Sequence, residues 1–282
     1  MPAALRTRIA QSRWATPLGF LLRLREVSRH LMRQLRITSH WVLRSRETTN
    51  HSYAITALNR EHLAWWLANA LDQPVGRVRE LFDELEADEE LRSHLARVTA
   101  GSGFRRVTDP QPSYGRRLAW YALVRLLQPE VVVETGIDKG LGSCVLASAL
   151  LRNGHGHLYA IDTSPQAGWM VAGAYSELVT VIHDDAVAAI GSLGQPVDLL
   201  VHDVHHTQEQ EAQEYDAVLE RSPRAVLLND NAHSYDVLPS LCEQRGFRYH
   251  HFDDQPSGTW FAGSGLGLAL PSPGGAAKQS LG

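Results

Sequence analysis

The sequence predicts an α/β protein with a doubly wound, mostly parallel sheet of seven strands, an antiparallel C-terminal hairpin and an α-helical region before the sheet. From about residue 113, short β-branched runs alternate with helical segments, as in right-handed βαβ units. Before that point, apolar residues recur every three to four positions, which is typical of helices. We therefore expect a helical N-terminal region over 1–112, an α/β domain over 113–270, and a disordered tail rich in Pro, Gly and Ser over 271–282.

The beginning of the chain is strongly basic. Residues 1–50 contain ten Arg and two Glu, a net charge of +8, so the rest of the chain carries −12 of the total of −4. Leu24, Val27, Leu31 and Leu35 follow helical spacing, which predicts a basic amphipathic helix. Such a helix can lie on anionic lipid. The opposite charge within the same chain instead favours packing on the body of the protein or on a second subunit, so we expect a lid or a homo-oligomer, such as a dimer.

Composition excludes several classes of protein. The 282 residues are 44% apolar, enough for a sizeable core, and the net charge of −4 gives no general attraction to nucleic acid. Two cysteines, Cys144 and Cys242, exclude a disulfide scaffold and an all-cysteine zinc site. No apolar run reaches the ~18 residues of a membrane span. Since no signal-peptide pattern is recognised either, we expect a cytoplasmic location.

The elements of the domain can be assigned in order. Between Asn59 and Ala100 the apolar stripes stay helical, with breaks at Pro74 and Gly76, and a linker rich in Gly, Pro and Arg follows. Strands are expected at 131–134, 158–162, 179–183, 197–202 and 225–229, with helices between them. The last two strands, 247–253 and 259–270, are expected to form a hairpin through the turn at 255–258.

The first predicted strand ends in a glycine-rich turn. Glu134, Gly136 and Gly140 form the pattern E-x-G-x-x-x-G, and Ser143 opens the following helix. Glycines at such a turn let a ligand approach the backbone closely, and the helix N-terminus offers free N–H groups. The carboxylate would repel a pyrophosphate, but it would attract a cationic amino-acid or sulfonium ligand.

Two further acidic sites follow the next strands. Asp162 ends the second strand, where a carboxylate can accept hydrogen bonds from both hydroxyls of a ribose. Asp184 and Asp185 follow the third strand, where either carboxylate can accept a hydrogen bond from an adenine amino group.

Together these motifs resemble those of the class I S-adenosylmethionine-dependent methyltransferases, over roughly residues 113–270. The resemblance implies a Rossmann-like sheet and S-adenosylmethionine as cofactor. It implies that Glu134, Gly136 and Gly140 hold the methionine moiety, that Asp162 holds the ribose, and that Asp185, with Asp184 as its rival, holds the adenine. Ser143 departs from the pattern, because related O-methyltransferases have their serine one residue earlier.

The fourth and fifth strands end in a second polar group. Asp203, Asp230 and Asn231 follow these strands, and their oxygen atoms suit a hard cation such as Mg²⁺. The group resembles the metal site of catechol-type O-methyltransferases. The spacing from Asp203 to His206 is similar to that of bacterial sugar O-methyltransferases, whose histidine is the base, and His205 is the nearest rival.

These resemblances predict a divalent-metal-dependent O-methyltransferase acting on a hydroxyl of a sugar, another small polyol or a natural product. The helical region would cover or complete the acceptor pocket. The alternatives are an N-methyltransferase or hydroxylase on the same fold, and a non-catalytic S-adenosylmethionine-binding protein.

Some residues remain open to other interpretations. His202, His205 and His206 could form a zinc or nickel site. Alternatively, Asp203 and Asp230 could simply cap helices. Arg116 and Arg117 precede the first strand and could either cover the cofactor or make surface contacts.

Overall fold

The computed structural model describes residues 7, 11, 15–48, 52–204 and 207–272. The chain divides into two compact units. One contains the residues up to Ser45 together with Gly258–Trp260, and the other contains Arg46–Ser257 and the residues from Phe261 onward. Each unit is described by itself.

The larger unit is built on a seven-stranded sheet in the order β4-β3-β2-β5-β6-β9-β7. The strands are β2 (Val131–Thr135), β3 (His157–Ile161), β4 (Val179–Ile182), β5 (Leu199–His202), β6 (Val226–Asn229), β7 (Phe247–Phe252) and β9 (Leu266–Pro271). The first five pair in parallel, so their carboxyl ends meet at one edge of the sheet. The predicted fold class is confirmed.

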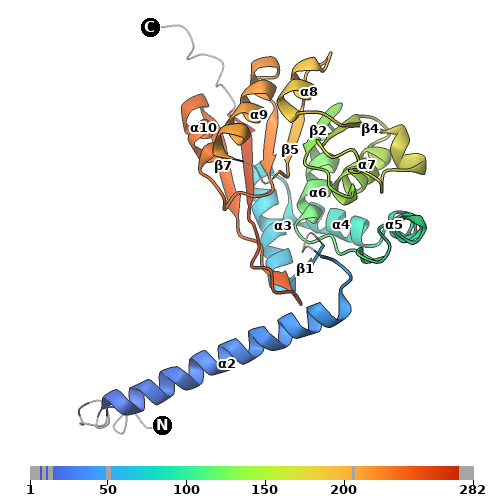
Figure 1. The fold of residues 1–282 in the computed structure, drawn as a ribbon. Coiled ribbons are helices and arrows are strands. Elements are labelled where there is room, and N and C mark those ends of the chain that lie inside the picture. Colours follow the sequence, from blue (N-terminus) through green and yellow to red (C-terminus); the bar gives the residue numbers. More distant parts are fainter. Residues whose placement is uncertain (1–6, 8–10, 12–14, 49–51, 205–206, 273–282) are drawn as a thin grey trace. The chain divides into compact units, whose positions relative to one another are not determined.

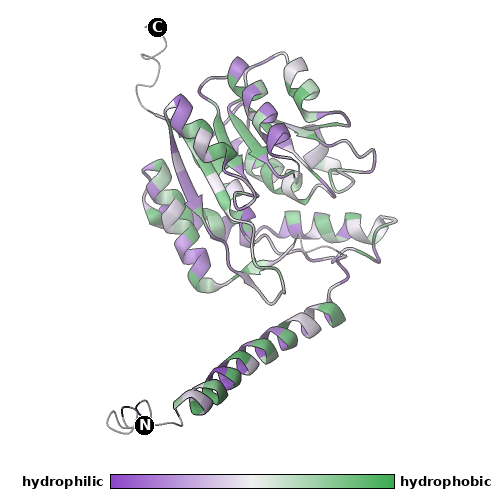
Figure 2. Cartoon of the chain, turned by 60° about the vertical axis from the view of Figure 1, so that its left-hand side comes forward, coloured by the Kyte–Doolittle hydropathy of each residue, from purple (hydrophilic) through white to green (hydrophobic). Residues whose placement is uncertain are grey.

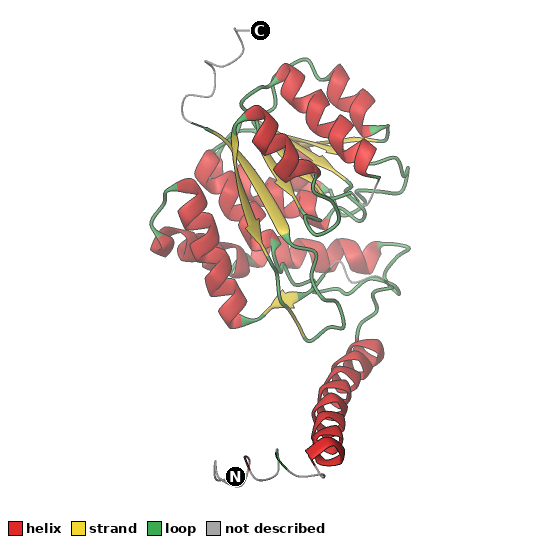
Figure 3. Ribbon diagram, turned by 90° about the vertical axis from the view of Figure 1, so that its left-hand side faces the viewer, coloured by secondary structure: helices red, strands yellow, loops and turns green. Residues whose placement is uncertain are grey.

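Helices cover both faces of the sheet, as Figure 3 shows. One face carries α3 (Ala57–Leu71), α4 (Val75–Glu86), α5 (Glu89–Gly101), α6 (Arg117–Leu127) and α7 (Leu141–Asn153). The other carries α8 (Ala186–Ser192), α9 (Gln208–Arg221) and α10 (Val237–Arg245). Neighbouring strand residues point to opposite faces, so Val132 lies in the first core while Val131 and Val133 lie in the second. In Figure 2 the inner strands are therefore mostly hydrophobic, whereas the edge strand β7 is mostly hydrophilic.

The C-terminal strands differ in detail from the predicted hairpin. β9 lies between β6 and β7 and is antiparallel to both, and it begins at Leu266 rather than at residue 259. The residues expected to form the turn include a short strand, β8 (Pro256–Ser257), which pairs with β1 (Ala54–Ile55). Asp254 holds the rest of the connection by accepting hydrogen bonds from the backbone N–H groups of Ser264 and Gly265 at 2.9 and 2.8 Å.

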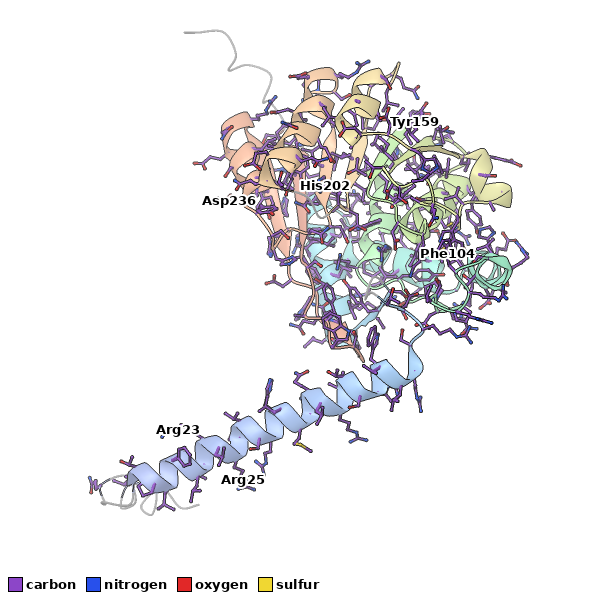
Figure 4. All side chains as sticks on the ribbon, in the orientation of Figure 1. Arg23, Arg25, Phe104, Tyr159, His202 and Asp236 are labelled. Atoms are coloured by element: carbon purple, nitrogen blue, oxygen red, sulfur yellow. The ribbon has the colours of Figure 1, made fainter. Side chains whose placement is uncertain are left out.

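The smaller unit contains the predicted amphipathic helix, α2 (Ala15–Arg44), shown in Figure 1. None of its described residues is buried, and the apolar stripe through Phe20, Leu24, Val27 and Leu31 is exposed. Arg23 and Arg25 mark its basic character in Figure 4. In the described part of the chain, no helix combines the length and apolar character needed to cross a membrane.

Candidate active site

The turn between β2 and α7 is shaped by Asp162. One carboxylate oxygen, Oδ2, accepts hydrogen bonds from the backbone N–H groups of Ile137 and Asp138, both at 3.1 Å. The other, Oδ1, accepts one from the N–H of Ser164 at 2.8 Å. The acid at the end of the second predicted strand therefore fixes the backbone of the glycine-rich turn.

Gly136 allows this turn to lie against the end of β5. Its φ angle is +80°, and a Cβ atom here would lie 2.3 Å from the carbonyl oxygen of Asp203. Any side chain at this position would push the two strand ends apart, so glycine is required for the close approach of the ends of β2 and β5.

A pocket opens where β2, β3 and β4 end. Gly136, Asp162 and Asp184 line it, together with Val204 and Gln210. Asp185 caps α8, because its Oδ1 accepts a hydrogen bond from the N–H of Ala188 at 3.0 Å. Of the two neighbouring acids, Asp184 is thus the one that lines this pocket.

Glu134 and Ser143 lie below the turn and not in the pocket. Their side chains are buried, and Ser143 Oγ donates a hydrogen bond to Glu134 Oε2 at 2.5 Å. Burial raises the pKa of Glu134 to about 8, although the bond from Ser143 acts against the rise. Gly142 leaves room for this carboxyl group, since a Cβ there would lie 2.2 Å from Glu134 Oε1. The part that Glu134, Gly140 and Ser143 would take in binding a methionine moiety stays a prediction.

Asp230, at the end of β6, is completely buried. Its Oδ1 accepts a hydrogen bond from Trp120 Nε1 at 2.9 Å, and its Oδ2 forms an ion pair with Arg116. Arg116 also pairs with Asp254 and donates a hydrogen bond to the hydroxyl of Tyr53. Asp230 is therefore held by two residues that precede the sheet in the sequence.

Asp203, at the end of β5, has its own arginine. Arg117 Nη2 lies 3.3 Å from its Oδ2, and Asn231 Nδ2 donates a hydrogen bond to its Oδ1 at 3.3 Å. The side chain of Asp203 is 18% exposed, whereas that of Asp230 is not exposed at all. Burial raises the pKa of Asp203 and the charge of Asp230 adds to the rise, while Arg117 opposes it.

The three residues predicted to bind a metal thus lie together, but in this arrangement they do not fit a divalent ion. Each oxygen of Asp203 and Asp230 accepts a hydrogen bond or pairs with a cation, and the two cations would repel a metal ion. Among the described residues, no three His, Cys, Asp or Glu side chains are grouped so that they could hold a metal ion.

Asn231 is positioned through Asn229 by residues of α9, which packs on the opposite face of the sheet from α6. Asn229 Oδ1 accepts a hydrogen bond from the N–H of Asn231 at 2.7 Å, and Asn229 Nδ2 donates to Glu211 Oε1 at 2.8 Å. Tyr215 also donates to Glu211 Oε1, at 3.0 Å. Since Glu211 and Tyr215 are both on α9, this helix positions the end of β6.

The histidines divide between the two faces. His205 and His206, the predicted bases, lie outside the described residues. His202, labelled in Figure 4, is buried, with its Nε2 3.5 Å from Glu214 Oε2 and its ring against that of Tyr215. It therefore packs against α9, on the face opposite to the core that contains Trp120.

Sequence analysis did not predict the contacts that hold the strand-end acids, which involve Tyr53, Arg116, Arg117, Trp120 and Asp254. The one signal was a pair of adjacent arginines at the start of a helix whose next residues, Leu118–Val124, are all buried. Charged residues entering a core need partners of opposite charge. The acids at the strand ends are such partners.

Comparison with known proteins bears on the domain type and on the fold. Residues 133–232 match the family model described as a methyltransferase domain. No curated protein matches the chain in sequence. The solved structure of cofactor-bound Rv0187 from MTB superposes with a TM-score of 0.51 at 18% identity, over 65% of this chain and 90% of that chain. The O-methyltransferase from Bacillus cereus in complex with SAH superposes with a TM-score of 0.50 at 15% identity, over 69% of this chain and 96% of that chain.

At these identities the likeness concerns the fold, and the family match concerns the segment that contains the glycine-rich turn and the ends of β2 to β6. The pocket and the arginine–carboxylate pairs lie at the carboxyl ends of these strands, where ligands bind in open α/β sheets. Residues 133–232 match the model of a methyltransferase domain, and the chain shares the fold of these two solved structures.

Proposed function

We propose that this chain is an S-adenosylmethionine-dependent O-methyltransferase whose acceptor is a hydroxyl group of a small molecule, such as a sugar or another polyol. One observation carries the proposal. The pocket lined by Gly136, Asp162 and Asp184 and the polar group of Asp203 and Asn231 occupy adjacent strand ends on one edge of the sheet. A cofactor in the first place would present its methyl group to an acceptor in the second.

The reaction needs little covalent chemistry from the protein. The acceptor oxygen forms a bond to the methyl carbon as the carbon–sulfur bond breaks, and the electron pair of that bond stays on sulfur and neutralises the sulfonium. The hydroxyl proton passes to a base, for which His206 is the predicted residue and His205 its rival. Asp203 and Asn231 orient the hydroxyl, since Asp203 is the more exposed of the two strand-end carboxylates.

The proposed reaction contains no step through a divalent cation, although the sequence predicts one. The carboxylates that would coordinate it are paired with Arg116 and Arg117. Positioning the two reactants supplies much of the rate enhancement, because oriented reactants can save up to about 7–11 kcal/mol.

Calorimetric titration with S-adenosylmethionine tests the cofactor half of the proposal. We expect the wild-type chain to bind and Asp162→Ala to lose about 10–100-fold in affinity, because the lost hydrogen bonds involve a charged group. Asp236→Ala is the matched control and should bind normally, because it removes an exposed aspartate that directly precedes α10 and whose side chain makes no capping hydrogen bond. Unchanged affinity in Asp162→Ala, with thermal unfolding like wild type, would contradict the assignment of the pocket.

A screen of hydroxyl compounds with radiolabelled S-adenosylmethionine tests the acceptor half. Label transfer to oxygen in a sugar or polyol is the expected result. Tight cofactor binding without transfer to any hydroxyl, and with transfer to nitrogen acceptors, would instead indicate an N-methyltransferase. Binding without any transfer would indicate a protein that only holds the cofactor.

A further inference from the structure

Two buried arginines occupy the part of the site where a related enzyme would be expected to hold a metal ion. Arg116 and Arg117 are adjacent at the start of α6, and they are only 7% and 9% exposed. Arg116 pairs with Asp230 and Arg117 with Asp203. Two guanidinium groups together carry the same charge as one divalent cation.

The pairs account for all four carboxylate oxygens. Arg116 and Trp120 donate to the two oxygens of Asp230, and Arg117 and Asn231 donate to those of Asp203. A divalent cation needs several such oxygens free to coordinate it. It would also have to enter beside two positive charges in a region shielded from solvent, where electrostatic repulsion is strong.

Arg116 is anchored from several elements. Besides Asp230, it contacts Tyr53, which precedes β1, and Asp254, which follows β7. Asp254 is fixed in turn by the backbone N–H groups of Ser264 and Gly265. Withdrawing Arg116 to admit a metal ion would leave a buried guanidinium or a buried carboxylate without its partner, which is strongly unfavourable.

Arg117 is held less tightly. Its ion pair with Asp203 is 3.3 Å long, its guanidinium lies 5.0 Å above the ring of Trp120, and its side chain is 11% exposed against 8% for Arg116. Its partner Asp203 is also the more exposed of the two carboxylates. Of the two arginines, Arg117 is therefore the one placed to contact an acceptor.

We propose that Arg116 and Arg117 take the place of a divalent cation in this site, so that Arg116 fixes Asp230 as a structural support and Arg117 positions the acceptor oxygen beside Asp203. The assignment of Arg117 rests on the proposed O-methyl transfer. The exclusion of a metal ion does not depend on it. Asp203, Asp230 and Asn231 thus match the sequence pattern of a divalent-metal site, but in this proposal they bind no metal ion.

Electron paramagnetic resonance of Mn²⁺ mixed with the full chain tests the exclusion without any assay of activity. We expect the signal of free Mn²⁺ to persist at millimolar ion, with or without S-adenosylhomocysteine. Stoichiometric binding that is lost in Asp203→Asn would overturn the proposal. The proposed function could still hold in that case, since S-adenosylmethionine binding is measured separately.

Removing Arg117 should free one oxygen of Asp203 and weaken the repulsion of a metal ion. Arg117→Met keeps much of the side-chain volume and loses the charge, so we expect it to bind Mn²⁺, whereas Arg117→Lys keeps the charge and should not. Arg125→Met removes a partly buried arginine from the same helix, paired with Glu84 on α4, and should behave as wild type. If folded Arg117→Met binds no more Mn²⁺ than Arg125→Met, Arg117 is not what excludes the ion and the proposal fails.

Methyl transfer supplies the last measurement. Once an acceptor is found, excess chelator should leave the wild-type rate unchanged, and Arg117→Met should raise the KM for the acceptor more than the KM for S-adenosylmethionine. A rate abolished by chelator and restored by Mg²⁺ would overturn the proposal while leaving O-methyl transfer intact. Failure to bind S-adenosylmethionine would instead contradict the proposed function and leave the Mn²⁺ result standing.

Discussion

The two parts of the sheet edge hold their carboxylates in different ways. At the ends of β3 and β4, Asp162 and Asp185 accept hydrogen bonds from backbone N–H groups that lie between 2 and 25 residues away in the sequence. At the ends of β5 and β6, Asp203 and Asp230 are held by side chains 86 and 114 residues away. The first arrangement uses the backbone of nearby loops, and it leaves Asp162 among the residues that line the pocket. The second arrangement joins distant parts of the chain, and each acid is paired with an arginine.

The largest expected effect comes from breaking the distant pairs. Arg116→Met leaves Asp230 and Asp254 buried without their cation, so we expect a loss of at least about 3–5 kcal/mol in the free energy of unfolding. Chemical denaturation measures it. Adding Asp230→Asn should recover part of the loss, since it removes one of the unpaired charges. If Arg116→Met alone is as stable as wild type, the ion pairs of Arg116 with Asp230 and Asp254 do not stabilise the fold.

The buried acid beneath the glycine-rich turn gives the next largest effect, and it depends on pH. In the folded chain the pKa of Glu134 is about 8, so it stays protonated up to that pH, whereas an unfolded glutamate has an ordinary pKa of 4.5. The contribution of protonated Glu134 to the free energy of unfolding is therefore complete below about pH 4.5, and it is lost as the pH rises towards 8. Glu134→Gln, which cannot ionise, should be more stable than wild type by roughly 3 kcal/mol at pH 8 and similar to it at pH 5. If wild type and Glu134→Gln have equal melting temperatures at both pH values, Glu134 ionises with an ordinary pKa.

Substitutions of Asp184 and Asp185 test which of these two neighbouring acids lines the pocket and which one caps α8. Asp185→Ala removes the cap of α8 and should cost about 1 kcal/mol of stability, with little change in S-adenosylmethionine affinity. Asp184→Ala should do the opposite, lowering affinity with little change in stability, because Asp184 lines the pocket. Calorimetry and denaturation of both variants check this. If the two effects are exchanged, Asp185 is the residue that contacts the adenine.

The smallest effect on the pocket should come from α2. Deleting residues 1–45 removes the smaller unit's helix, whose apolar stripe has no cover of its own, so we expect a change in oligomeric state and in acceptor turnover. Affinity for S-adenosylmethionine should stay close to that of the full chain. Sedimentation and calorimetry measure the two quantities. A folded truncation that no longer binds the cofactor would contradict this division between the units.

The sequence predicted the local features well. Val131, Val132 and Val133 are all apolar, which indicates a strand buried on both faces, and the glycines and acids beside such strands locate the turn and the pocket. It could not predict the arginine pairs, since nothing near Arg116 in the sequence indicates that Asp230 is its partner. The start of β9 was missed for a similar reason. Asp254 and the pairing of β8 with β1 redirect the chain, and both depend on distant contacts.

The placement of β9 also has a consequence for how the protein is made. β7 leaves the ribosome before β9, yet β9 is the strand that joins it to the rest of the described sheet. Until residue 271 has been synthesised, β6 keeps an open hydrogen-bonding edge and β7 has no neighbour in the sheet. Parallel pairing of the earlier strands can begin during synthesis. Completion of the described sheet must wait until β9 has been synthesised, so until then the nascent protein has a strand edge that is open to wrong partners.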